Sequence, residues 1–212
     1  MFAVGHMAIG YLLGKATAKP FKLSPNIPAL LVLSIIPDID IITGISEFHR
    51  GPTHSIITAL LIFTPLFIIY RKKAIPYFFA LLSHSLLGDI IGGEQQLLWP
   101  LTQKNISLPP TIPQIEINST ANAAIELTIF TFALIAMYKA KDFQKLFKNN
   151  KTNLLLTIPI VTVLLPTFLA YPLSVPAVLI PPHLLYLILF TLSTLIAVYN
   201  ILKRPTTQKL PS

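Results

Sequence analysis

The stretch IPALLVLSIIPDIDIITGIS, residues 27–46, has the length of a membrane-spanning helix and carries two carboxylates, Asp38 and Asp40. A spanning helix needs about 20 predominantly apolar residues. Ionised side chains inside such a segment are energetically costly and commonly mark a functional site. This stretch therefore predicts a membrane protein and tells us where to look first for its function.

The composition of the whole chain agrees with that prediction. Its 212 residues are 53% hydrophobic and only 11% charged, and the mean hydropathy is +0.69. Such a chain has too few polar side chains to cover a soluble globule. Since no linker, repeat or fall in hydropathy divides it, we expect one structural domain. For description we divide it into a motif-bearing half (1–101), an external loop or lid (102–119) and scaffold helices (120–212).

Seven apolar segments predict an all-α, polytopic transmembrane bundle with an extended external loop. The first, from Phe2 to Leu13, lacks a basic start and a clear cleavage site, so we expect it to be retained rather than removed as a signal peptide. Prolines inside several other segments predict short or broken helices. Those six segments are residues 27–46, 54–70, 74–92, 120–138, 153–171 and 183–202.

Positive charge predicts the orientation of the bundle. Lysines and arginines gather at residues 15–22, 71–73, 139–151 and 203–204, and such clusters mark cytoplasmic loops. Basic and non-basic loops alternate along the chain, as seven spanning segments require. The N-terminus is then outside and the C-terminus in the cytoplasm, and we expect the protein in the inner or plasma membrane. We therefore attribute the net charge of +8 to the cytoplasmic loops that orient the bundle. Because no basic, aromatic-interleaved face accompanies it, we expect no nucleic-acid partner.

Potential metal ligands are concentrated in the first half of the chain. Four of the five histidines and three of the four aspartates precede residue 90, and cysteine is absent. His, Asp and Glu are then the only strong ligands available, and the predicted topology places the cluster at one depth towards the outer leaflet. We expect His6, Asp38, Asp40, His49, His54 and His84 to bind a divalent metal.

Two of the motifs leave alternatives open. In Pro37-Asp38-Ile39-Asp40, either the proline opens the helix so that both carboxylates converge, or only one of them points inward. His84 and Asp89 lie well apart in angle on a regular helix, so sharing a metal requires a bulge or an unwinding near Gly88. Otherwise Asp89 orients an imidazole from another segment.

The string His49-Arg50-Gly51-Pro52-Thr53-His54-Ser55 predicts a turn followed by a helix that Thr53 can cap. The planar guanidinium of Arg50 suits an anion such as a phosphate. With Arg50, we select Asp89 and Glu94 as catalytic candidates, Glu94 as a general base. His183, after two prolines, is expected to be structural.

Together these motifs resemble the YdjM-like family of inner-membrane-associated metal-dependent hydrolases, also described as LexA-binding. The resemblance covers about residues 1–101: His6, Pro37 to Asp40, the string from His49 to Ser55, and Ser83 to Pro100. In the third motif of the family, His and Asp commonly lie four residues apart, whereas here Gly88 makes the gap between His84 and Asp89 five. The resemblance implies a polytopic membrane protein with metal-dependent hydrolase activity.

Our leading expectation is therefore a membrane-embedded hydrolase that acts on a lipid or lipid-linked phosphoester through metal-activated water. One or two divalent ions would serve, zinc first, with Mn or Mg as alternatives. A metal-ion or proton transporter is the first alternative, since intramembrane His and Asp suit it equally. A non-catalytic membrane binding or scaffold protein is the second.

Overall fold

The computed structural model describes residues 1–43, 50–148, 150–169 and 175–203. Within these ranges the regular secondary structure is helical, with one isolated β-bridge between Gln95 and Ile106. The all-α prediction is confirmed for the described part of the chain.

The first half folds into short helices, several of them joined end to end. The α-helices are interrupted at the polar motifs, where 3₁₀ (η) or π turns replace them. These elements are α1 (Ala3–Ala18), η1 (Lys19–Phe21), α2 (Ile27–Leu33), η2 (Ile36–Thr43), η4 (Pro52–His54), α3 (Ile56–Tyr70), η5 (Arg71–Ala74), α4 (Ile75–Ser83) and the π-helix η6 (His84–Asp89).

The second half forms longer helical runs. Its elements are α5 (Thr120–Lys139), α6 (Phe143–Leu146), η7 (Lys151–Leu156), α7 (Thr157–Pro159), the π-helix η8 (Ile160–Leu164), α8 (Leu165–Phe168), η9 (Ala177–Leu179) and α9 (Ile180–Leu202).

Three helical runs of the described chain are long and apolar enough to cross a membrane: Thr120–Lys139, Lys151–Phe168 and Ala177–Leu202. They coincide with the last three predicted segments. In the first half α1 has 16 residues and α3 has 15, while α2 ends before the Pro-Asp motif. Seven full spans thus stay a prediction, since the polar motifs interrupt the apolar runs that carry them.

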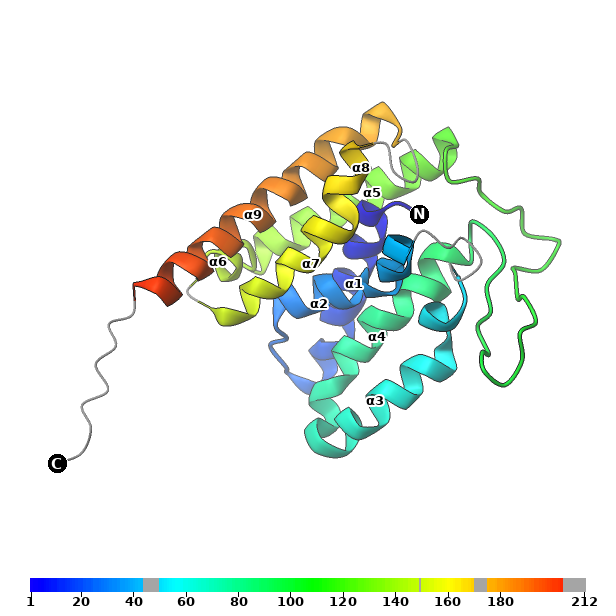
Figure 1. Ribbon diagram of the computed structural model, residues 1–212, viewed down its shortest axis with the longest axis horizontal. Helices are drawn as coiled ribbons and strands as arrows, with labels where there is room; N and C mark the ends of the chain where they lie inside the picture. Colours follow the sequence, from blue (N-terminus) through cyan, green and yellow to red (C-terminus); the bar gives the residue numbers. More distant parts are fainter. Residues whose placement is uncertain (44–49, 149, 170–174, 204–212) are drawn as a thin grey trace.

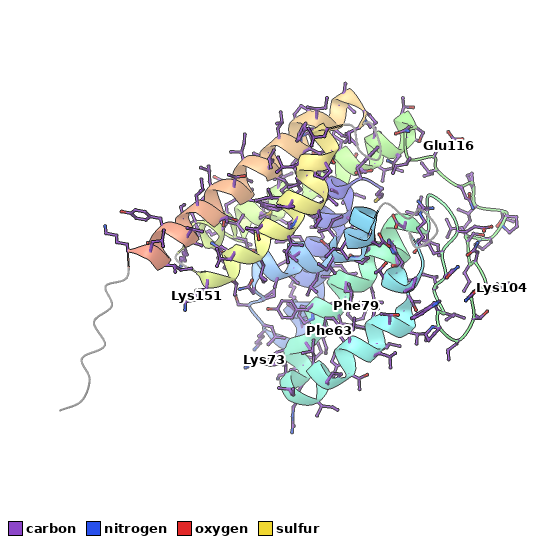
Figure 2. The ribbon with its side chains drawn as sticks, viewed as in Figure 1. Phe63, Lys73, Phe79, Lys104, Glu116 and Lys151 are labelled. Atoms are coloured by element: carbon purple, nitrogen blue, oxygen red, sulfur yellow. The ribbon has the colours of Figure 1, made fainter. Side chains whose placement is uncertain are left out.

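Helix α1 lies inside the bundle and connects its two halves. It packs against α4, α5 and α2. In Figure 1, α5, α7, α8 and α9 form one side of the molecule and α3 and α4 the other. The main core takes side chains from both halves, including Met7, Tyr11, Leu30, Phe130 and Tyr186. A smaller core, around Phe63, joins α3 to α4 (Figure 2).

The segment between η6 and α5 extends away from the helices (Figure 1). Figure 2 places Lys104 and Glu116 of this segment on one side of the molecule, and Lys73 and Lys151 of the basic loops away from it. This arrangement fits the predicted alternation of loops. The segment's position outside the cell and the orientation of the termini stay predictions.

Candidate metal centre

Four buried side chains converge where η2, η4 and η6 meet. Asp38, His54, His84 and Asp89 each contribute one ligand atom, and these atoms all lie within 4.8 Å of one another. Each of the four residues is at most 8% exposed. Residues 51 positions apart in the sequence thus form one compact group that could hold a metal ion.

The π-helix η6 brings His84 and Asp89 together. The amide of Ile90 donates to the carbonyl of Ser85, five residues earlier, at 3.1 Å. A π turn places residues five apart on one face, and single π turns are frequent at functional sites. His84 Nε2 therefore lies 3.4 Å from Asp89 Oδ2. The bulge that the five-residue gap requires is present.

Helix η2 lets both aspartates of the Pro-Asp motif reach His54, from opposite edges of its ring. Asp38 Oδ1 lies 3.5 Å from His54 Nε2 and 3.2 Å from His84 Nε2. Asp40 Oδ2 lies 3.4 Å from His54 Nδ1 and accepts a 2.6 Å hydrogen bond from Thr53. Asp38 therefore belongs to the four-residue group. Asp40, which we predicted to be a ligand, lies instead at the opposite edge of the His54 imidazole.

The hydrogen bonds at the outer ring nitrogens fix the histidine tautomers. His84 Nδ1 lies 2.8 Å from the carbonyl oxygen of Ser34, which can only accept, so Nδ1 carries the proton. The Thr53 hydroxyl gives its proton to Asp40 and lies 3.0 Å from His54 Nδ1, so it accepts from that nitrogen. When the two rings are neutral, both Nε2 atoms direct lone pairs into the group, the arrangement typical of metal-ligating histidines.

Inside the group, electron-pair donors face one another at short distances. The two Nε2 atoms are 3.1 Å apart, and Asp89 Oδ2 is 3.2 Å from His54 Nε2. Two neutral imidazoles and two carboxylates in a buried space repel one another unless positive charge lies among them, carried either by protons on the imidazoles or by a cation. A divalent ion can supply that charge, and a set of two nitrogens and two oxygens suits tetrahedral zinc.

His6 lies beside the group rather than in it. Its Nε2 is 3.1 Å from Asp89 Oδ1 and also 3.1 Å from the carbonyl oxygen of Met1. Its ring stacks on His84, with centroids 3.9 Å apart and planes at 16°. Residue 88 must be glycine here, because a Cβ atom would overlap the His6 ring. His6 thus orients the outer oxygen of Asp89.

The remaining predicted residues lie at the edge of the centre or beyond it. His49 lies outside the described residues. Arg50 has a φ of 65° and places its guanidinium against Gly93. Glu94 is exposed, and its Oε2 accepts a 3.2 Å hydrogen bond from Asn105.

His183 is buried elsewhere, and its Nδ1 donates to the carbonyl of Leu179 at 2.7 Å. This contact agrees with the structural role expected for it. The helix cap is corrected: Ser55, not Thr53, caps α3 by accepting from the amides of Ile57 and Thr58 at 3.1 and 3.3 Å. The Thr53 hydroxyl instead donates its hydrogen bond to Asp40.

Two residues that support the centre escaped the sequence-based reasoning. Ser34 contributes only its backbone carbonyl, to His84, and such a contact cannot be predicted from the identity of a side chain. Gln95 is buried and donates from Nε2 to the carbonyl of Ser85 at 3.1 Å, anchoring the start of the long loop to η6. Its position directly after Glu94, in a polar stretch, gave no signal.

By fold and site, the molecule is an integral membrane protein with a buried candidate metal centre. The family model described as YdjM inner membrane protein matches residues 1–199, and the chain belongs to that family. The resemblance seen in the motifs is confirmed, and the match extends beyond residue 101 through the long helices. No curated protein and no solved structure matches the chain.

Proposed function

We propose that this protein is a membrane-embedded, metal-dependent hydrolase. The observation that supports the proposal is the buried group of Asp38, His54, His84 and Asp89, whose ligand atoms lie close enough together to hold a metal ion. One divalent ion suits this set, with zinc first and Mn or Mg as alternatives. When bound, such an ion lowers the pKa of a coordinated water towards about 7 and polarises a phosphoryl or acyl oxygen.

The chain's own residues divide the remaining tasks. Asp89 directs Oδ2 to the two histidines of the group and Oδ1 to His6, so it links the ligand set to a third imidazole able to share a proton. Arg50, two residues before η4, offers a planar fork for a phosphate. Glu94 is exposed and accepts a hydrogen bond from Asn105, so we assign no catalytic role to it.

The substrate that we propose is a lipid or lipid-linked phosphoester at the outer leaflet. Two features support this choice: the centre is built into apolar helices of a membrane protein, and the distribution of basic loops predicts that it faces outwards. The chain exposes large apolar side chains along α3, such as Leu61, Ile62 and Ile68, as a lipid-facing helix does.

The first test is metal content. The wild-type protein, purified without chelators and measured by plasma mass spectrometry, is expected to contain stoichiometric metal, which His54→Ala and Asp38→Ala lose. His183→Ala is the matched control, because His183 is equally buried but lies outside the group. A wild type free of metal under these conditions overturns the proposal.

The second test is activity. Metal-loaded protein is incubated with a panel of phospholipids and isoprenoid phosphates, with His54→Ala as the inactive reference. Product release by the wild type alone is the expected result. If the wild type binds metal but releases no product from any member of the panel, the hydrolase assignment to this substrate class is wrong.

The transporter alternative has weaker support. A transport path needs ionisable groups at several depths, yet the buried acids of the second half are already bound by protein groups. Glu126 accepts from backbone amides and Asp142 pairs with two lysines. A metal-flux assay in sealed vesicles separates the two functions.

A further inference from the structure

Glu126 is a fully buried carboxylate in α5 that lies outside the metal centre. Its Oε1 accepts hydrogen bonds from the amide of Phe2 at 2.7 Å and from the side chain of Asn122 at 2.7 Å. Its Oε2 accepts from the amide of Gly5 at 3.0 Å. A glutamate more than 120 residues away thus binds the first turn of α1.

These contacts replace a missing helix cap. The first amides of a helix have no acceptor within the helix, and Phe2, at the N-cap position of α1, has no side chain that can accept. In a membrane no water is available to pair with such amides, so leaving them unsatisfied is costly. A carboxylate at this end also interacts favourably with the helix dipole. Glu126 therefore fixes both the position and the direction of the start of α1.

The carboxylate of Glu126 contacts Gly5, the residue directly before His6. A Cβ atom on Gly5 would lie 2.8 Å from Glu126 Oε2, so the close approach requires glycine there. The next residue is His6, whose ring stacks on His84 and whose Nε2 contacts Asp89. Any displacement of the first turn of α1 moves this imidazole.

We propose that Glu126 is a positioning residue for the metal centre: by binding the first turn of α1, it holds His6 against Asp89 and His84. This inference rests on the proposed metal centre, and it gives the second half of the chain a direct part in the site. It also accounts for a carboxylate buried in a predicted membrane span.

The opposite end of α1 provides a matched control. Asp142 accepts a 2.8 Å hydrogen bond from Tyr11 and pairs with Lys15 at 2.8 Å. Lys15 is nine residues from His6, or about 14 Å along a helix. Asp142 thus tethers the same helix to the same half of the chain, but through Tyr11 and Lys15, five and nine residues after His6.

The experiment compares Glu126→Gln with Asp142→Asn in the full-length protein in detergent. Carbethoxylation of His6 by diethylpyrocarbonate, followed by mass spectrometry, is measured on metal-free protein. Co²⁺ affinity and the visible Co²⁺ spectrum are measured on the same samples. We expect Glu126→Gln to label His6 several-fold faster and to weaken Co²⁺ binding about 10-fold, the usual effect of removing an outer support of a metal site.

Asp142→Asn is expected to leave His6 labelling and the Co²⁺ spectrum unchanged, and Glu126→Asp to fall between Glu126→Gln and the wild type. Equal effects of Glu126→Gln and Asp142→Asn, or none from either, overturn the inference. If Glu126→Gln does not fold, Gly5→Ala displaces the same carboxylate from the other side and must give the same changes. Faster His6 labelling with no Co²⁺ binding by the wild type rejects the metal centre but keeps the positioning role.

Discussion

At the scale of single residues, His54 connects the ligand group to its support. Its Nε2 faces Asp38, His84 and Asp89, while its Nδ1 faces Thr53 and Asp40. The two aspartates of one motif therefore have different tasks, although they are two residues apart. In the proposed metal centre Asp38 would offer an oxygen to the ion, and Asp40 would orient the imidazole that binds it.

This division predicts different losses from two similar substitutions. Asp38→Asn is expected to abolish metal binding, because it removes a charged ligand from the group. Asp40→Asn is expected to weaken affinity about 10- to 100-fold, as loss of an outer support does, and to reach full occupancy at high metal concentration. Isothermal titration measures both. Equal loss of stoichiometry in the two variants would contradict the assignment.

Gly88 gives a second prediction at this scale. A methyl group there would overlap the His6 ring, and overpacking a buried site destabilises by about 1–3 kcal/mol. Gly88→Ala is therefore expected to lower the melting temperature in detergent and to reduce metal content. Gly92→Ala is the control, since its Cβ would meet its nearest neighbours at 3.6 Å. A normal melting temperature for Gly88→Ala would mean that His6 is not held as described.

At the scale of elements, the sequence predicts the long helices better than the short ones. The apolar run 120–138 corresponds closely to α5, because a continuous apolar segment has one favourable structure in a membrane. The run 27–46 becomes α2 and η2 instead, since Ser34 and Pro37 interrupt it. Motif spacing left open whether a bulge brings His84 and Asp89 together, and the role of Asp40 depends on where tertiary packing places η4.

The contact of α1 with the loop after α5 predicts a dependence on pH. Burial alone would raise the pKa of Asp142, but hydrogen bonds from Lys145, Lys15 and Tyr11 hold it below its ordinary value. A lowered carboxyl pKa stabilises the fold above the unfolded-state value of about 3.9, and this contribution is lost as the pH falls below it. Thermal stability in detergent is expected to fall on acidification through this range.

Asp142→Asn tests that dependence, because the amide cannot titrate. The variant is expected to be less stable than the wild type at neutral pH and to lose less stability on acidification. Parallel stability curves for the two proteins would show that other carboxylates carry the acid dependence.

At the scale of the whole molecule, the two halves are interdependent. Glu126 and Asp142 bind opposite ends of α1, and α1 contributes His6 to the surroundings of the metal centre. The segment after residue 120 therefore also binds the helix that carries His6, and the family match continues through it to residue 199. The motif-bearing half is expected to bind metal poorly when expressed without this segment.

The predicted orientation decides which side of the membrane supplies the substrate, and it can be tested directly because the chain has no cysteine. Thr111→Cys places a thiol in the long segment between η6 and α5, and Gln144→Cys places one in a basic loop; both positions are exposed. Because basic loops stay in the cytoplasm, a membrane-impermeant maleimide is expected to label position 111 in intact cells and position 144 only after permeabilisation. The reverse pattern would place the C-terminus outside and make the inner leaflet the source of substrate.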